Sequence, residues 1–509
     1  MIKVVNMIPA SLSGESSQDS EPNIAVNPDN PKAIVGTAFT PAPMGGPNAP
    51  IYISSDGGNT WALRTVVPGN GPFGTADISV GFGGTGGHLY AGILNGLTTH
   101  LQILRTANYA AVTPMTVLLE RANEDQPWVV ATTTKVKTAN RDRVYVGNNN
   151  FNTVPKTATV DLSLNAATGA APAGFGPHRV ENGAANPQDG PPVRCAVHPD
   201  GTIYAAFDRW KSGYSAAGNY TMDVVVTRDD NWGSGANPFQ ALGAAGKVVA
   251  PNRFIRWNAI MGQERLGGDL AIAVDPNNSG TVWIAWCDRV GGVQGTDWTM
   301  HVRRSTDHGA TWSADLRTIT NAKNPALAVN SNGELGLLYQ AFTGTRWVTR
   351  LELTFNGWST AATTVVLHTA PSSTPARTFF PYIGDYVRMI AVGANFYGVF
   401  CGNNTPDMAN FPSGVTYQRG ANWATKTLLS TDGVTHVAPS IDPFFFEWSP
   451  PPIPIIAPAP QPVAVSPITR EPVITKPQPI SIIDPPPPLQ PPAATRKPGR
   501  RGKGSTIDL

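Results

Sequence analysis

The chain has 509 residues, enough for a large core, and carries a net charge of +2 with only 14% charged residues. That balance excludes a strong global field and argues against specific nucleic-acid binding. No run of 18 apolar residues exists, so we expect no transmembrane segment. Met1–Ser20 shows no Sec signal peptide, which leaves export by another route or association with a particle as expectations for localisation.

One pattern recurs along the chain: an apolar strand, a turn rich in Asn, Asp, Gly or Pro, and a second strand with aromatic residues. A repeat of this kind predicts the blades of a propeller, each closing against the next around a channel. The predicted strand pairs are 23–29 with 33–36, 77–80 with 89–92, 127–130 with 144–147, 193–201 with 203–207, 270–276 with 282–286, 326–330 with 335–339, and 389–393 with 396–400.

A turn motif follows the third strand of two of these units. It reads S-x-D-x-G-x-T-W, and its residues are Ser54, Asp56, Gly58, Thr60 and Trp61 in one copy and Ser305, Asp307, Gly309, Thr311 and Trp312 in the other. Asp accepts hydrogen bonds from the amides after it, Gly tolerates a left-handed backbone, and Trp packs between sheets. Segments 224–230, 351–358 and 415–423 are predicted as third strands with degenerate copies, and 101–107 as one without the motif. Fourth strands are expected at 63–67 and 316–319.

The motif resembles the Asp box, or bacterial neuraminidase repeat, of sialidases and related β-propellers. The resemblance implies an all-β propeller in which these turns are structural and lie away from the active site. Sialidases have six blades, whereas the repeats here predict seven four-stranded blades, with six as the alternative. We expect Met1–Pro9 and Thr435–Trp448 to meet and close the ring, which makes residues 1–448 the propeller domain.

Residues 449–509 differ in composition, being Pro-rich with a basic end from Arg496 to Lys503. Such a segment is predicted to be an extended, disordered tail. It is either a plain spacer or a docking segment for a protein partner or an anionic surface.

Acidic residues recur just before the innermost strand of most units: Glu21, Asp77, Asp125, Asp189, Asp269 and Asp385. If these strands surround one channel, the carboxylates gather at its mouth, where they can supply a general acid or bind a cation such as calcium. The alternative is that each one caps backbone amides at the start of its strand. We assign Asp125 and Asp269 as the candidate catalytic pair, and Asp189 and Asp385 as candidate ligand-binding residues.

A second recurring feature follows two of the second strands: Asp208-Arg209-Trp210 and Asp288-Arg289. Arginine beside an aromatic face suits a sugar ring, so Arg209, Arg289 and Trp210 are candidate ligand residues, with Trp286 as a further aromatic. The alternative is a surface ion pair beside core tryptophans.

The sialidase resemblance also implies an arginine triad, a Tyr nucleophile paired with Glu, and an Asp acid/base. No Arg-Ile-Pro motif is present; Arg143, Arg209, Arg265, Arg289 and Arg377 can approach the channel, and Glu264 and Tyr386 have no supporting motif. We therefore expect a sialidase-like propeller that binds or hydrolyses carbohydrate. The alternative is a non-catalytic glycan- or protein-recognition propeller, displayed on a larger assembly through its tail.

Overall fold

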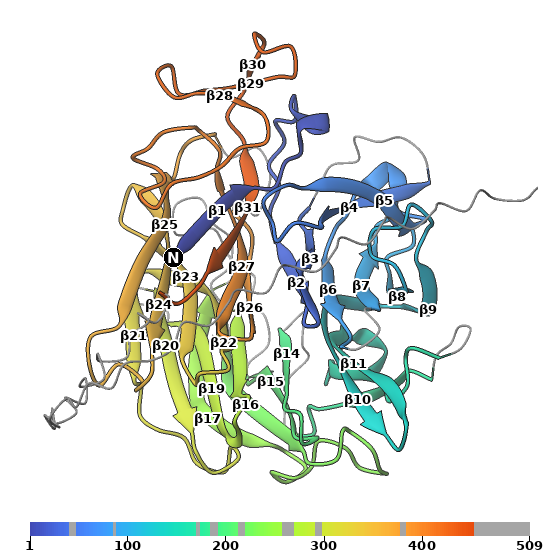
Figure 1. Cartoon of the computed structure of the whole chain (residues 1–509). Helices are drawn as coiled ribbons and strands as arrows, with labels where there is room; N and C mark the ends of the chain where they lie inside the picture. Colours follow the sequence, from blue (N-terminus) through green and yellow to red (C-terminus); the bar gives the residue numbers. More distant parts are fainter. Residues whose placement is uncertain are drawn as a thin grey trace, which may run out of the picture. The chain divides into compact units, whose positions relative to one another are not determined.

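The computed structural model describes residues 1–39, 47–84, 88–168, 174–183, 192–211, 219–256, 269–290, 298–376 and 383–451. The chain divides into a body spanning Met1–Pro452 and a second unit, Ile453–Leu509, which lies outside the described residues together with nearly all of the predicted tail. The body is a ring of antiparallel sheets (Figure 1).

Seven four-stranded sheets form the ring, as the repeats predicted. Their innermost strands are neighbours in the order β2, β6, β10, β14, β18, β22, β26 and back to β2. From the innermost strand outward, the blades are β2 (Asn23–Asn27), β3 (Asn30–Thr37), β4 (Asn48–Ser54) and β5 (Ala62–Pro68); β6 (Ile78–Phe82), β7 (Leu89–Asn95), β8 (His100–Thr106) and β9 (Thr116–Ala122); β10 (Glu124–Val136), β11 (Ala139–Asn150), β12 (Ala158–Ser163) and β13 (Gly176–Arg179); β14 (Val193–Val197), β15 (Ile203–Trp210), β16 (Asn219–Asp229) and β17 (Lys247–Arg256); β18 (Leu270–Asp275), β19 (Asn278–Arg289), β20 (Trp298–Ser305) and β21 (Arg317–Thr320); β22 (Ala322–Val329), β23 (Leu335–Phe342), β24 (Arg346–Thr354) and β25 (Thr363–Pro371); and β26 (Arg388–Val392), β27 (Asn395–Asn403), β31 (Ile441–Trp448) and β1 (Ile2–Asn6).

The seventh blade closes the ring with both ends of the propeller. Strand β1 pairs antiparallel with β31, from Ile2 opposite Trp448 to Asn6 opposite Phe444. The predicted meeting of the two flanking segments is therefore confirmed. Because the first strand of the chain completes the last blade, the ring cannot open without breaking this pairing.

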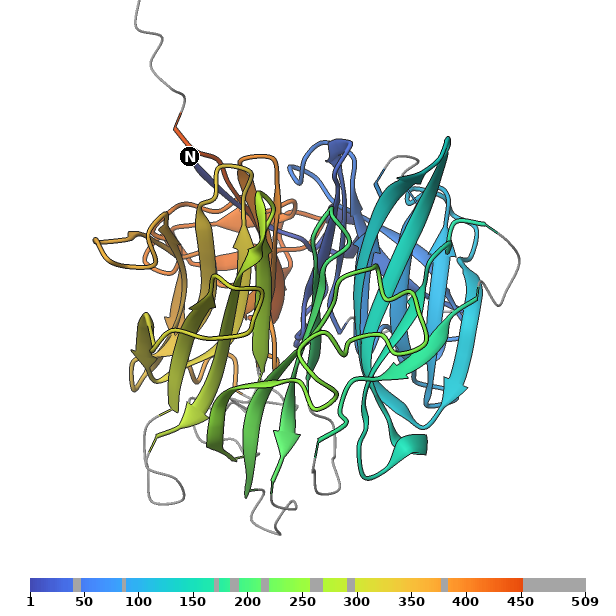
Figure 2. The ribbon, with the colours of Figure 1, turned by 90° about the horizontal axis from the view of Figure 1, so that it is seen from below.

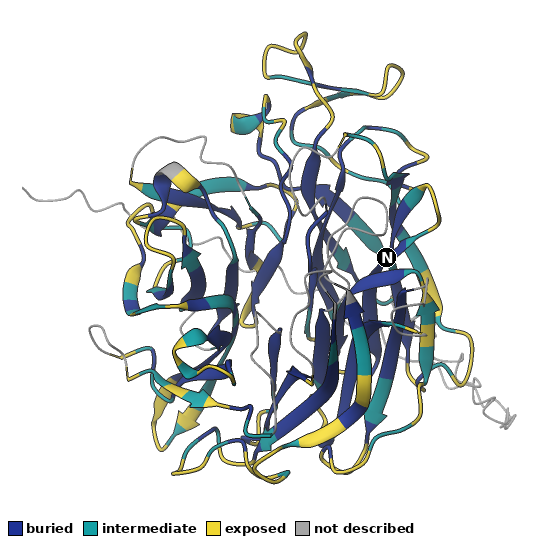
Figure 3. Cartoon of the chain, turned by 180° about the vertical axis from the view of Figure 1, so that it is seen from behind, coloured by how far each residue is buried: buried dark blue, intermediate teal, exposed yellow. Residues whose placement is uncertain are grey.

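The inner strands of most blades are buried on both faces because each blade is covered by a blade on either side. Figure 3 shows the inner strands largely buried, with exposed residues in the turns and on outer strands such as β13 and β21. Strand β15, for example, is buried along its whole length. This explains why the strands appear in the sequence as continuous apolar runs rather than as alternating patterns.

The first Asp-box turn is built as the motif predicts. The Asp56 carboxylate accepts hydrogen bonds from the Thr60 amide (3.0 Å) and hydroxyl (2.6 Å), and the Ser54 hydroxyl accepts one from the Gly58 amide (2.8 Å). Gly57 and Gly58 both have positive φ, 79° and 81°. The second turn repeats these bonds with Ser305, Asp307, Gly309 and Thr311.

Two degenerate turns keep the same backbone path. Consecutive positive φ values occur at Trp232 and Gly233 (60° and 73°) and at Gly357 and Trp358 (64° and 63°). In the second of these, Thr354 takes the place of Ser, since its hydroxyl accepts a hydrogen bond from the Trp358 amide (3.2 Å). All these turns follow a third strand, so they lie at the opposite end of the blades from the starts of the innermost strands.

One predicted strand is wrong. Segment 415–423 is not the third strand of the seventh blade; that strand is β31. The segment belongs to an insertion between β27 and β31 that forms a separate small sheet of β28 (Gly420–Asn422), β29 (Thr427–Leu429) and β30 (His436–Val437). Its Gly and Trp imitate the repeat in sequence but not in structure. Three short 3-10 helices, η1 (Ala10–Leu12), η2 (Gly71–Phe73) and η3 (Phe151–Thr153), complete the described elements.

Candidate functional site

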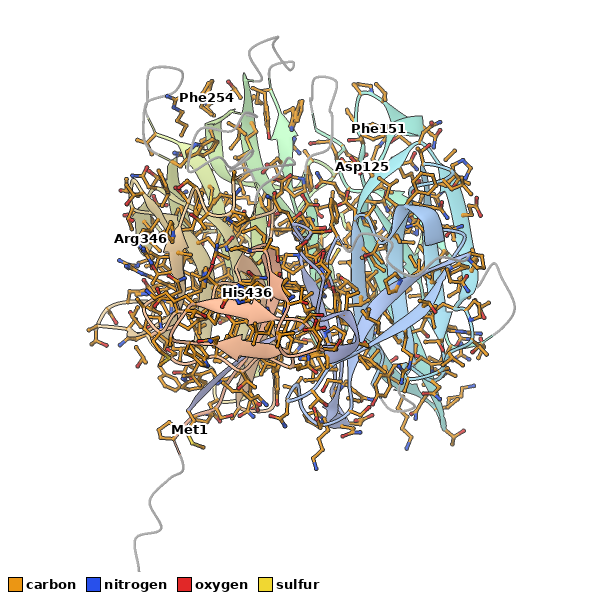
Figure 4. The ribbon with its side chains drawn as sticks, turned by 90° about the horizontal axis from the view of Figure 1, so that it is seen from above. Met1, Asp125, Phe151, Phe254, Arg346 and His436 are labelled. Atoms are coloured by element: carbon orange, nitrogen blue, oxygen red, sulfur yellow. The ribbon has the colours of Figure 1, made fainter. Side chains whose placement is uncertain are left out.

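The propeller has two faces, which carry opposite ends of the strands. We call the face on which the innermost strands begin the funnel face, and the face of the Asp-box turns the turn face. Figure 4 shows Asp125 near one end of the blades and Met1 at the other, and Figure 2 shows the N-terminus at the turn face. Asp77, Asp125, Asp269 and Asp385 all stand at or just before the start of an innermost strand, on the funnel face.

Three innermost strands, β2, β10 and β22, share an unusual backbone at or near their starts. Glu21, Gln126 and Asn324 have positive φ values of 54°, 53° and 55°, and each directly precedes a proline. A non-glycine residue in this region costs roughly 1–2 kcal/mol. Backbone strain of this kind tends to collect at functional sites, and here it lies at the mouth of the channel.

The centre of the funnel is a buried ion pair. Arg194 on β14 donates from Nη2 to Asp269 Oδ1 at 2.8 Å, and the two residues are only 3% and 5% exposed. Nε and Nη1 of Arg194 are buried and find no hydrogen-bond partner among the described residues. Unmet donors on a buried cation are costly. Nε and Nη1 of Arg194 therefore need hydrogen-bond acceptors that these residues do not supply.

Aromatic rings hold this arginine in place. The Arg194 guanidinium lies 3.9 Å from the centre of the Trp128 ring, and Arg388 lies 4.8 Å from the same ring. Tyr386 meets Trp128 edge-on at 5.6 Å and donates to Asp77 Oδ1 at 3.1 Å. The cluster thus draws on blades two, three, four, five and seven, with Trp128 at its middle.

Two cations share this small volume. Arg388 donates to Asn23 Oδ1 (2.9 Å) and to the Val129 carbonyl (2.8 Å), both neutral acceptors. Burial, and then the charge of Arg194, lower the pKa of Arg388 to about 9. The pair of guanidinium groups therefore repel each other, and an anion placed between them would relieve that repulsion.

Burial raises the pKa of Asp269 to about 6, although the charge of Arg194 opposes the shift. Burial and the negative charge of Asp269 also raise the pKa of Asp208, which lies on β15, well above its ordinary value. Asp269 can therefore change its protonation state near neutral pH, as a general acid requires. Tyr386 has the opposite property: burial and Asp77 raise the pKa of its hydroxyl, which leaves it a poor nucleophile.

A cavity of about 300 Å³ extends along the channel from this cluster. Trp128, Arg194, Asp269 and Arg388 line it at the starts of their strands. Further along, the walls are apolar residues of the same innermost strands, such as Ala271, Leu327 and Ala328. The site is therefore a charged and aromatic mouth above an apolar channel.

Asp125 lies on the same innermost strand as Trp128. It is half-buried, sits opposite Asn149 in the β10–β11 pair, and accepts a hydrogen bond from the Gln126 amide (2.8 Å). Asp385, 6% exposed, directly precedes Tyr386. Asp189, Glu264, Arg265 and Arg377 lie outside the described residues.

The candidate sugar-binding residues at the ends of the second strands lie outside the cluster around Arg194. Arg209 pairs with buried Glu181 at 2.9 Å. Trp210 is fully buried and stacks on Tyr220 with ring centres 4.0 Å apart. Trp286 is also fully buried and stacks on His301 at 5.0 Å. Arg289, on β19, is half-buried and ends its strand opposite Trp298. None of these four residues lines the cavity at the channel mouth.

Sequence reasoning missed Arg194 and Arg388, the two arginines of the site. Each is a single charge in an otherwise apolar innermost strand, as in Val193-Arg194-Cys195-Ala196-Val197. A charge in such a strand must face the channel or a neighbouring blade, and this is the sequence signal that identifies both arginines.

The described residues hold no group of three or more His, Cys, Asp or Glu side chains arranged to bind a metal ion. They also include no helix long and apolar enough to span a membrane.

Comparison with known proteins gives no family. No protein-family model and no curated protein matches this chain. Among solved structures, it is similar to a GH74 xyloglucanase from Xanthomonas campestris (TM-score 0.41, 15% identity, covering 70% of this chain and 48% of that one). It is also similar to a PL25 ulvan lyase (TM-score 0.48, 8% identity, covering 76% of this chain and 92% of that one). A third similar structure is an α-L-arabinanase from Penicillium chrysogenum (TM-score 0.38, 11% identity, covering 87% of this chain and 97% of that one). The chain thus spans about half the length of the xyloglucanase.

Proposed function

We propose that the funnel binds an acidic carbohydrate, with the sugar's carboxylate held by Arg194. The observation that carries this proposal is a guanidinium that is 3% exposed, lines the cavity, stacks on Trp128, and keeps two donors unused by the described residues. A planar guanidinium matches a carboxylate with two parallel hydrogen bonds. Trp128, which lines the cavity, adds an aromatic side chain of the kind against which sugar rings pack.

The proposed chemistry is that of a sialidase-like glycoside hydrolase. Asp269 is the general acid, since its pKa of about 6 keeps part of it protonated near neutral pH. Asp125, on the far side of Arg194 in the ring, is the second carboxylate. Replacing Asp269 with Asn tests this directly: sugar release from acidic glycosides should be lost, while binding is kept. Wild-type protein that binds such sugars but releases none would make this a recognition propeller.

The pH dependence of binding follows from the ion pair of Asp269 with Arg194. Above pH 6 the Asp269 carboxylate is charged, neutralises Arg194 and repels an incoming anion. Below pH 6 it is neutral, while a sugar carboxylate with a pKa of about 3.5 stays charged. We therefore expect affinity for an acidic sugar to fall as pH rises through about 6, by up to about tenfold per pH unit.

Titration calorimetry between pH 5 and pH 8 measures this dependence. Asp269→Asn, a neutral mimic of the protonated acid, should bind equally well across that range. A wild-type affinity that does not change with pH, or an Asn variant that retains the full slope, would refute the role given to Asp269.

A second candidate function, display of a recognition propeller on a larger assembly, is favoured by where the propeller ends. Trp448 pairs with Ile2 and with Phe396, at the turn-face ends of β1 and β27. The last strand of the body therefore ends at the face opposite the funnel. In the sequence beyond it, five of the eight residues from Arg496 to Lys503 are basic. Attachment through that segment would leave the funnel open to ligand.

Truncation after residue 451 tests this candidate. The shortened chain should keep its melting temperature and its affinity for acidic sugar, but should no longer sediment with vesicles that contain phosphatidylglycerol. Vesicles of neutral phosphatidylcholine are the control. If both chains sediment equally, the tail is only a spacer.

A further inference from the structure

A groove on the turn face has no role in the funnel. It has a volume of about 620 Å³ and lies between the third and fourth blades, where Thr132, Thr134, Lys135, Lys137, Arg143 and Trp232 line it. One wall is the end of the β10–β11 hairpin, whose strands are 13 and 12 residues long, against 5 and 8 for β14 and β15. The hairpin therefore projects past its neighbour and shelters the space beside it.

The side chain of Arg143 is held in a fixed orientation in this groove by one hydrogen bond and one stacking contact. Its Nε donates to Thr134 Oγ1 at 2.8 Å, and its guanidinium lies 4.7 Å from the centre of the Trp232 ring. Trp232 is itself fixed, since its amide donates to Gly201 O (2.9 Å) and its carbonyl accepts from the Tyr145 hydroxyl (3.0 Å). Stacking and one hydrogen bond orient the guanidinium without neutralising it.

The groove is rich in uncompensated positive charge. Lys135, Lys137 and Arg143 line it, and exposed Arg141 lies in the same stretch of nine residues. Among the described residues, no ion pair joins any of these four to a carboxylate. Asp142, the one acid between Thr132 and Arg143, accepts hydrogen bonds from Tyr90 of the second blade (2.7 Å) and from Thr133 of its own blade (2.5 Å). Burial, together with the charge of Arg141, lowers the pKa of Arg143, so a bound anion would stabilise the local structure.

We propose that this groove is a second ligand site, which binds a stretch of acidic polysaccharide through its sulfate or carboxylate groups. Arg143 and the two lysines would contact the anionic groups, and the Thr132 and Thr134 hydroxyls would meet ring hydroxyls. The groove's single tryptophan has a face covered by Arg143, which leaves no series of open aromatic faces for bases. The net charge of +2 likewise lacks the broad positive field of a nucleic-acid-binding protein. This site does not depend on the proposed function of the funnel.

The test is the binding of fluorescein-labelled dextran sulfate, followed by fluorescence anisotropy. The variant Lys135→Ala/Lys137→Ala should bind at least tenfold more weakly than wild type, and Arg143→Gln should weaken binding further. The control Lys32→Ala/Lys247→Ala removes the same charge from exposed lysines outside the groove and should bind as wild type does. All these positions are on the surface or half-buried, and thermal melting confirms that each variant folds.

Two results would overturn the proposal. One is equal binding by the groove variant and the control variant, which would make the attraction a general charge effect. The other is binding of a single-stranded DNA oligomer with the same affinity and the same dependence on Lys135 and Lys137, which would make the ligand a nucleic acid. Because the funnel is also proposed to bind acidic sugar, the groove variant and the control variant are compared in the Arg194→Met background, so that a difference between them cannot come from the funnel.

Discussion

Replacing Arg194 with Met should weaken binding of an acidic sugar at the funnel by about a hundredfold, because two charge-assisted hydrogen bonds are lost at about 1.5–3 kcal/mol each before partial compensation. Met fills much of the same space against Trp128 without charge. Stability should fall by less than the roughly 3–5 kcal/mol typical of a broken buried ion pair. The reason is that Asp269, with a pKa already raised to about 6, takes up a proton once its partner is gone.

Arg209→Met is the matched control, since Arg209 is also a buried arginine paired with a buried carboxylate, that of Glu181. It should lose stability and keep its affinity for the sugar, measured by calorimetry on folded protein. Loss of binding in both variants would extend the site to Arg209, a candidate on sequence grounds. Full binding by Arg194→Met would remove the basis of the funnel site.

Replacing Arg419 with Ala should lower the free energy of unfolding by about 3–5 kcal/mol, the largest stability effect we expect from one substitution. Arg419 is fully buried and donates to the Asp442 carboxylate and to the carbonyls of Ser13 (3.1 Å) and Glu15 (2.9 Å). It thereby ties the insertion to the N-terminal segment and to β31. Without it, Asp442 becomes a buried charge with no cation beside it.

The loss should depend on pH. Burial and the charge of Asp442 raise the pKa of Glu15 to about 7, and burial raises that of Asp19 well above its ordinary value, while Arg419 lowers both. An acid with a raised pKa binds its proton more tightly in the folded state, so stability falls as pH rises from about 4.5, the unfolded value, through 7. Removing Arg419 raises these pKa values further, so the variant should lose more stability at pH 8 than at pH 5.

Urea denaturation at both pH values measures this effect. Lys426→Ala is the control, because it breaks an ion pair with Asp407 whose lysine is 56% exposed and should cost only about 0.5–1 kcal/mol. An equally small loss for Arg419→Ala, or a loss independent of pH, would contradict the role of this arginine as the cation for three carboxyl groups.

The architecture could be predicted because a propeller repeats. In each blade, the innermost strand and the second strand carry the same sequence pattern. The continuous apolar runs of the second strands β15 and β19 identify strands covered on both sides. The Asp-box residues Ser54 and Asp56 could be assigned because their role is local, and the hydrogen bonds they accept lie within four residues. The prediction of a third strand at 415–423 was wrong because Gly and Trp near a strand are too short a signal to distinguish a blade from an insertion.

The site could be predicted only in part. Asp269 was found because acidic residues recur at one position of the repeat, and the structure adds the partner that defines its chemistry, Arg194. That pairing joins residues 75 positions apart on different blades, so spacing along the chain could not reveal it. The Asp-Arg-Trp pattern looked like a sugar site, but Trp210 stacks on Tyr220 within the core, where its burial depends on the neighbouring strand.

The most direct test of the central claim is calorimetric titration of wild-type protein at pH 5 with matched pairs of sugars that differ only at the carboxylate. A glucuronoside or sialoside is compared with its carboxyl-reduced analogue, which keeps the ring and its hydroxyl groups. The acidic sugar should bind about a hundredfold more tightly, because only it supplies the acceptors that the Arg194 donors need. Equal affinity for both members of each pair, or binding to neither, would contradict the claim that the funnel is a site for acidic carbohydrate.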